Sequence, residues 1–306
     1  MRAWFVVATI LGTPASLASQ QDSAALRAPD VHFVPTEPAV VRAMLRVAQV
    51  GPKDLVYDLG CGDGRIVISA VKRYGARGVC VDIDPVRIAE SRRNADTAGV
   101  ARRITFREGD LFEMDLSDAT VVTLYLLPAL NERLRPKLFD ELRPGSRIVS
   151  NAFDMGDWKA DSLLRIDPAS AFPSFAYFWI MPADVAGAWN VTVAVAGLSK
   201  QREESEYQIR MDQRYQQVTG TGSTNGRSVS ITDESLAGDR LSFTINDSIA
   251  GRSTALRFSG QVAGDKAAGT VRDGQGRRAG SWTAMRAERG PRPELEPEEA
   301  TDAPLR

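Results

Sequence analysis

An acid and three alternating glycines, Asp58, Gly60, Gly62 and Gly64, follow an apolar run in the first quarter of the chain. Glycine adopts a positive φ readily and places no Cβ in a loop, so a bound group can lie directly on the backbone. The helix-like pattern that begins at Arg65 directs free N–H groups to the same place. A dinucleotide fingerprint requires G-x-G-x-x-G, and arginine at position 65 argues against an NAD site.

The Asp58-x-Gly60-x-Gly62-x-Gly64 pattern resembles motif I of class I S-adenosylmethionine (SAM) dependent methyltransferases. Three other stretches resemble the bacterial relatives of the mitochondrial protein-lysine methyltransferase family: Phe33 to Pro38, Val81 to Pro85 and Thr123 to Pro128. The resemblance covers residues 31–182. It implies an α/β fold with a Rossmann-like, seven-stranded methyltransferase sheet, and SAM as the cofactor that donates the methyl group.

The resemblance also implies which residues bind the donor. Gly60, Gly62 and Gly64 would hold the methionine end of SAM by close backbone approach. Asp58 would lie beside its ammonium group, and Thr36 is a candidate hydroxyl contact. No metal ligand is implied.

Two more acids stand at predicted strand ends. Asp82 lies where an acid accepts both ribose hydroxyls, and Asp110 resembles the acid that takes the adenine amino group. Asp84 is better interpreted as the N-cap of a helix that begins with Pro85. The alternative for each acid is that it only caps a helix or turns the chain.

Tyr125 ends the predicted fourth strand, where this fold places residues that face the acceptor; the alternative is a core tyrosine. Leu126 to Pro128 would form an apolar wall beside it. A lysine of ordinary pKa, ~10.4, has on the order of one neutral amine in two thousand at pH 7, so desolvation would have to release its proton. Candidates for the acceptor channel follow the fifth strand, although Asp154 and Asp157 could equally cap a loop there: Asn151, Phe153, Asp154 and Trp158.

Strand-like and helix-like patterns alternate around these residues and predict a parallel sheet with helices on both faces. Strands are expected near Leu55–Asp58, Gly78–Asp82, Ile104–Arg107, Thr120–Leu126 and Arg147–Ser150, and a closing hairpin from Ser162–Ile166 and Phe175–Met181. Helices are expected near Arg65–Tyr74, Pro85–Thr97 and Asn131–Leu142. A lid helix over Val40–Ala48 is expected beside the first strand.

The pattern changes after Pro182 to alternating apolar and polar residues, which predicts an all-β domain over residues 187–286, a small meander barrel or sandwich. Gly238-Asp239 and Gly264-Asp265 suit two-residue hairpin turns. The domain resembles lipocalin-like modules only in outline, and either ligand binding or packing against the first domain would explain it. Residues 287–306, rich in Pro and Glu, are expected to be a disordered tail.

Composition restricts the partners. The formal net charge of –1 indicates no clear nucleic-acid surface. One histidine and two cysteines are too few for a structural zinc site, so Cys61 and Cys80 are expected to be packed thiols. His32 could approach the ligand, but a surface or packing role is favoured.

The first residues predict export. Residues 1–18 combine Arg2, an apolar run and Ser16-Leu17-Ala18, which is typical of a cleaved signal peptide; residues 19–30 would be a flexible lead-in. The expected location is therefore periplasmic or exported, and the alternatives are a cytoplasmic chain or one associated with the membrane through its N-terminus. Export conflicts with the cytosolic synthesis of SAM.

The function predicted by resemblance is methyl transfer from SAM to a nucleophilic acceptor, with a protein lysine favoured. The alternatives are a small-molecule methyltransferase and an exported, non-catalytic binding protein.

Overall fold

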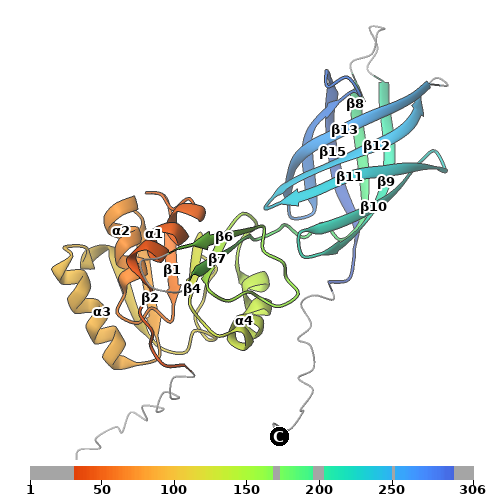
Figure 1. The fold of residues 1–306 in the computed structure, drawn as a ribbon. Helices are drawn as coiled ribbons and strands as arrows, with labels where there is room; N and C mark the ends of the chain where they lie inside the picture. The colour runs from red at the N-terminus through yellow and green to blue at the C-terminus, as the bar shows by residue number, and fades with distance from the viewer. Residues whose placement is uncertain (1–30, 168–172, 196–202, 250–251, 293–306) are drawn as a thin grey trace, which may run out of the picture.

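The computed structural model describes residues 31–167, 173–195, 203–249 and 252–292. The predicted signal peptide and lead-in, residues 1–30, lie outside this described part. Two bodies are visible in Figure 1, an α/β domain and a β-barrel, joined by a short linker after β7. No helix within the described ranges is both long and apolar enough to cross a bilayer.

The first body contains a seven-stranded sheet in the order β3-β2-β1-β4-β5-β7-β6. Strand β7 runs antiparallel to both β5 and β6, and the other neighbours are parallel. The predicted fold and its closing hairpin are therefore confirmed. The strands are β1 (Leu55–Leu59), β2 (Arg77–Asp82), β3 (Ile104–Glu108), β4 (Val121–Leu124), β5 (Arg147–Asn151), β6 (Ser162–Ile166) and β7 (Ser174–Ile180).

Helices cover both faces of this sheet (Figure 1). They are α1 (Pro38–Val47), α2 (Arg65–Tyr74), α3 (Pro85–Thr97) and α4 (Pro128–Glu141), with a short 3-10 turn at Ala101–Arg103. Helix α1 was expected beside the first strand as a lid, but it lies against α2 and strands β5 to β7. Helix α4 begins three residues before the prediction, because Pro128 has a preset φ and needs no hydrogen-bond partner at the first helical position.

The second body is a closed eight-stranded antiparallel barrel in which β15 pairs with β8. Its strands are β8 (Gly187–Val195), β9 (Glu203–Arg214), β10 (Gln217–Thr224), β11 (Arg227–Ala237), β12 (Arg240–Ile249), β13 (Arg252–Ala263), β14 (Lys266–Arg272) and β15 (Arg278–Arg289). Both predicted Gly-Asp turns are confirmed, with Gly238 and Gly264 each at φ 61°. Alternate residues fill the interior, including stacked Phe243 and Phe258.

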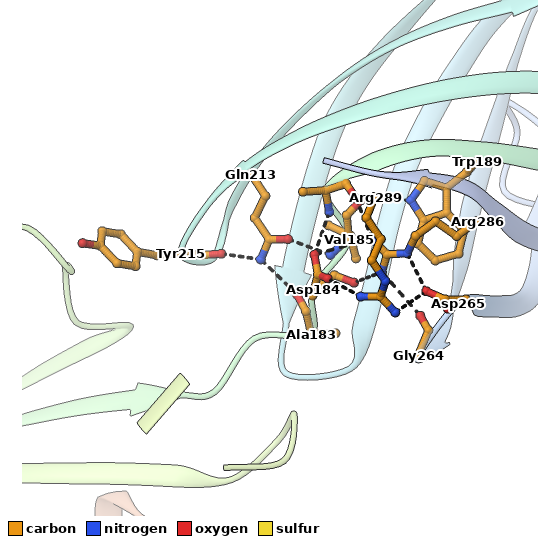
Figure 2. Close-up of polar contacts among 11 residues, drawn as sticks. Ala183, Asp184, Val185, Trp189, Gln213, Tyr215, Gly264, Asp265, Arg286 and Arg289 are labelled. Carbon is orange, nitrogen blue, oxygen red and sulfur yellow. Dashed lines mark hydrogen bonds and ion pairs between the residues drawn. The ribbon is translucent and has the colours of Figure 1, made fainter. Parts of the chain in front are cut away.

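Arg286 closes one end of the barrel (Figure 2). Its side chain is 2% exposed, lies 4.5 Å from the Trp189 ring centroid and forms an ion pair with Asp265 at 3.0 Å. The same guanidinium donates to the backbone carbonyl of Asp184 in the linker. Strand β15 continues to Arg289, which pairs with Gly187. The expectation of a disordered tail from residue 287 is therefore wrong for its first residues, because the barrel uses them to close.

Candidate active site

A cavity of about 600 Å³ opens at the carboxyl ends of β1, β2 and β4. The strand order reverses between β1 and β4, and ligands of open α/β sheets bind at such switch points. Six of the predicted site residues line the cavity: Thr36, Asp58, Gly60, Asp82, Asp110 and Tyr125. Thr36 and Tyr125, which are 89 positions apart in the sequence (125 − 36), thus line the same cavity.

The glycine loop turns between β1 and α2 with positive φ at all three glycines, 75°, 56° and 78°. Only Gly60 lines the cavity. A Cβ on Gly62 would lie 2.2 Å from a ring carbon of Phe33, and one on Gly64 would lie 2.9 Å from Ser91 Cβ. Gly62 is therefore needed for contact with the chain's own Phe33, and Gly64 for packing of α2 against α3.

Asp58 lies at the end of β1, and its side chain is fully buried. The hydroxyl of Thr123 on β4 donates to Asp58 Oδ1 at 2.7 Å, but Oδ2 has no hydrogen-bond partner among the described residues. Burial raises the pKa of Asp58 to about 7, although the Thr123 hydroxyl and the backbone N–H of Val67 lower it. A buried carboxyl group that keeps one oxygen without a close donor, on the wall of a cavity, suits a cationic ligand group.

Asp82 joins the end of β2 to the glycine loop. The N–H of Gly62 donates to Oδ2 at 2.8 Å, and the N–H of Asp84 donates to Oδ1 at 3.0 Å. Burial raises the pKa of Asp82, while these two donors lower it. Asp84 is the N-cap of α3, as expected, and accepts from the N–H of Val86 at 2.8 Å.

A disulfide joins Cys61 in the glycine loop to Cys80 in β2. The expectation of two packed thiols is therefore wrong, because the loop turns back beside β2 and brings the two Cα atoms to 5.4 Å, a usual distance for a bridge. The N–H groups of Gly60 and Cys61 also donate to the carbonyl of Val81. Covalent and hydrogen bonds together fix the loop that lines the cavity.

The segment before α1 covers part of the cavity. Phe33 packs on Gly62, and the Arg87 guanidinium lies 5.0 Å from its ring centroid. Arg65 at the start of α2 donates to the Thr36 carbonyl at 2.8 Å and pairs with Asp63. The covering element is thus residues 31–37, with His32 among the lining residues, rather than helix α1.

The third acid, Asp110, follows β3 and accepts from the N–H of Phe112 at 2.9 Å. The guanidinium of Arg133 lies 3.9 Å from the Phe112 ring centroid. Leu111 and Phe112 line the cavity beside Asp110 and offer an apolar surface for a planar group. Neither residue was predicted as part of the site, because no motif or spacing in the sequence marks them.

Tyr125 lines the cavity after β4, and its ring stacks on Phe153 with centroids 6.2 Å apart. None of the four predicted channel residues contributes to the cavity wall. Phe153 lies behind Tyr125, and Trp158 is 1% exposed in the core beside Trp179. The alternative of a loop cap fits Asp154, which accepts from the N–H of Gly156 at 3.2 Å, whereas Asp157 pairs with Arg135 of α4.

Comparison with known proteins gives consistent results for the first body. Residues 58–162 match the family model for the ANTKMT methyltransferase domain, which ends before the barrel. A protein-lysine N-methyltransferase of Saccharolobus islandicus is 46% identical over 140 residues, covering 45% of this chain and 87% of the relative. An adenine nucleotide translocase lysine N-methyltransferase of Mus musculus is 30% identical over 129 residues, covering 42% of this chain and 56% of the relative.

A similar solved structure is an RNA methyltransferase from Salinibacter ruber in complex with S-adenosyl-L-homocysteine. It is 52% identical with a TM-score of 0.45, and the match covers 48% of this chain and 93% of that chain.

Proposed function

The chain belongs to the family of class I SAM-dependent methyltransferases that includes protein-lysine methyltransferases, and on this premise we propose that it methylates the ε-amine of a protein lysine. Binding of SAM as the methyl donor is supported above all by Asp58, whose Oδ2 has no hydrogen-bond partner in the described part of the chain and which lines a cavity bordered by the glycine loop. The lysine acceptor rests on the two lysine methyltransferases to which the chain is similar.

The residues on the cavity wall fit SAM. Asp58 suits the ammonium group of its methionine end, because a cationic partner would supply the missing donors and compensate the burial of the carboxylate. Thr36 and Gly60 border the same part of the cavity. Gly62 and Gly64 do not line the cavity, but they allow Phe33 and α3 to pack on the glycine loop.

Asp82 suits the ribose diol, and two backbone donors already hold its carboxylate in place. Preorganised acceptors need little further ordering when a ligand arrives. Asp110, with Leu111 and Phe112, suits the adenine ring and its amino group. These assignments put one acid at the end of each of the first three strands, which is the order predicted from the sequence.

When bound, SAM supplies a methyl group on a cationic sulfonium, and an uncharged amine can displace the sulfur in line. The nitrogen–carbon bond forms as the carbon–sulfur bond breaks, and the amine proton leaves to water. The chain has to align the amine and exclude water. Tyr125 supplies an aromatic wall with Leu126, which is 3% exposed, and desolvation there favours the neutral amine.

The test is transfer of radiolabelled methyl groups from SAM to extracted cell protein and RNA, followed by hydrolysis of the labelled material. We expect methyllysine after acid hydrolysis of protein. Label found only in nuclease-sensitive material or in small molecules would contradict lysine as the acceptor, but not SAM as the methyl donor. Absence of SAM binding by calorimetry would overturn the donor assignment as well.

We also propose that the protein works in an oxidising compartment. The Cys61–Cys80 disulfide supports this location, because structural disulfides persist outside the reducing cytosol. The signal-like residues 1–18 agree with it.

A further inference from the structure

The hairpin between β9 and β10 has an aromatic residue where two other described hairpins of the barrel have glycine. Its turn residue Tyr215 has φ 57°, whereas Gly238 and Gly264 occupy positive φ in the turns predicted from the sequence. An aromatic residue in the left-handed region is strained and persists only when its surroundings hold it there. Tyr215 is 4% exposed and belongs to the hydrophobic core of the α/β domain.

The hairpin tip, residues Arg214 to Gln216, contacts α4, where the Phe139 ring centroid lies 5.8 Å from that of Tyr215, and the segment that follows β5. The Tyr215 hydroxyl donates to Asp157 Oδ1 at 2.8 Å, and the Tyr215 ring stacks on Trp158 with centroids 5.9 Å apart. Gln216 accepts from Trp158 Nε1 at 2.9 Å and donates to the carbonyl of Lys159 at 2.8 Å.

The barrel side of this contact is also fixed. The amide of Gln213 donates to the carbonyls of Ala183 and Tyr215, at 2.9 and 2.7 Å, and accepts from the N–H of Val185 (Figure 2). Gln213 is 7% exposed, so these bonds are shielded from water. These bonds hold the linker and the hairpin in one arrangement.

The other contacted segment, residues 151–160, begins at the end of β5 and lies behind the cavity wall. We call it the acceptor loop, because its Phe153 stacks on Tyr125 of the cavity wall. Helix α4 holds the other side of the loop: Asn131 donates to the Asp154 carbonyl at 2.9 Å, and Arg135 donates to the Met155 carbonyl at 3.1 Å. The loop is thus clamped between α4 and the barrel.

We propose that the hairpin tip of the barrel is a positioning element for the acceptor side of the active site, with Tyr215 as the positioning residue. The proposal rests on the proposed function, since it assigns the Tyr125 side of the cavity to the acceptor. Tyr215 acts through Asp157 and Trp158 on the loop that bears Phe153. It touches none of the donor residues, so donor binding is independent of it.

Tyr215→Phe tests the proposal in the full chain, because it removes only the hydroxyl and keeps the packed ring. A matched control is Tyr207→Phe: Tyr207 is 2% exposed and its hydroxyl also donates to an aspartate, Asp247, at 3.1 Å, but inside the barrel. We expect Tyr215→Phe to lower kcat/KM for the acceptor on the order of tenfold, the worth of one hydrogen bond to a charged group, with an unchanged SAM Kd. Tyr207→Phe should leave both values unchanged.

Hydrogen exchange gives a readout that does not depend on activity. Amides of residues 153–160 should exchange faster in Tyr215→Phe, while those of residues 60–64 stay as in the wild type. Equal behaviour of the two variants, or a weakened SAM Kd in Tyr215→Phe, would overturn the proposal. If Tyr215→Phe does not fold, Gln216→Ala replaces it with the same expectations. A wild-type chain that methylates nothing would contradict the proposed function. Faster exchange confined to residues 153–160 in Tyr215→Phe would then still show that the hairpin tip holds the acceptor loop.

Discussion

The carboxyl group of Asp58 is buried, and one of its oxygens has no hydrogen-bond partner among the described residues. Folding stability and ligand binding therefore favour different protonation states of this residue. Its pKa is about 7 in the folded chain and near the ordinary value of 3.8 in the unfolded chain. The folded state binds the proton more tightly, so this group stabilises the fold at pH below about 4 and loses that contribution as the pH rises through 7. A cationic ligand, by contrast, needs the ionised form.

The first prediction is therefore that SAM binds more tightly as the pH rises from 5.5 to 8, approaching tenfold per unit below pH 7. Asp58→Asn should weaken binding at pH 8 by roughly tenfold or more, because it removes a charged acceptor. It should also stabilise the ligand-free chain at pH 8 by about 1–3 kcal/mol, because it removes a buried charge. Calorimetry and denaturant unfolding measure both; pH-independent binding by the wild type would contradict this account.

The second prediction concerns Asp82. Asp82→Ala should weaken SAM binding by about 1.5–3 kcal/mol, since it removes a charge-assisted acceptor of two hydroxyls and frees the N–H of Gly62. Asp118→Ala is the control, because the Asp118 side chain is 75% exposed. A Kd for Asp82→Ala that equals the control value would remove Asp82 from the site.

The roles of single residues were only partly predictable from the sequence. Asp58, Asp82 and Asp110 could be placed in one cavity because each ends or follows a predicted strand, and parallel strands end at one edge of a sheet. The contact of Phe33 with Gly62 could not be predicted, because it depends on how a segment without regular structure crosses the loop.

At the scale of elements, turns with a local signal were predicted and turns held by tertiary contacts were not. Gly238 and Gly264 adopt a positive φ, which glycine favours because it has no Cβ, so the residue type alone predicts these turns. Tyr215 occupies the same region of φ only because the α/β domain holds its ring, so its local sequence gives no sign of a turn. The disulfide was missed for a related reason: the 19-residue separation of Cys61 and Cys80 does not reveal how the loop approaches β2.

The third prediction concerns this bridge between the glycine loop and β2. Replacing Cys61 and Cys80 by alanine should lower the free energy of unfolding of the α/β domain by on the order of 2–4 kcal/mol, because the unfolded chain loses a covalent constraint. The wild type should lose a similar amount in dithiothreitol, and the double variant should be insensitive to it. Two free thiols in the unfolded, unreduced wild type would contradict the disulfide.

At the scale of the whole molecule, the barrel interior is packed with side chains and its hairpin completes the core of the α/β domain. The contacts therefore favour a packing role for the barrel over that of a separate binding module. Phe139 and Trp158 both pack against Tyr215, so removing the barrel would expose an aromatic surface.

The fourth prediction is that a chain cut after Pro182 still binds SAM, because every proposed donor residue precedes the cut. The cut chain should be less stable and less soluble than the full chain, because Phe139 and Trp158 lose the cover of Tyr215. Calorimetry and thermal unfolding measure the two properties. A soluble, folded fragment that does not bind SAM would mean that the barrel contributes to the donor site.

The fifth prediction concerns the compartment, where two independent features agree. The apolar run from Ala3 to Leu11, followed by Ser16-Leu17-Ala18, predicts cleavage by a signal peptidase, and the disulfide requires an oxidant to accept its electrons. Mass spectrometry of the chain from separated cell fractions, with free thiols alkylated in denaturant before any reduction, measures both features on one molecule. We expect a periplasmic chain that begins near Ser19, with Cys61 and Cys80 unalkylated.

A cytosolic chain that retains Met1 and carries two alkylated cysteines would contradict both parts of this prediction. A cytosolic chain with the bridge intact would contradict export alone, and would mean that burial of Cys80, which is fully shielded from solvent, protects the disulfide from reductants. Export would in turn require a supply of SAM outside the cytosol and would restrict the acceptors to lysines exposed there. The compartment therefore determines which proteins can be substrates, whereas the donor site is the same in either location.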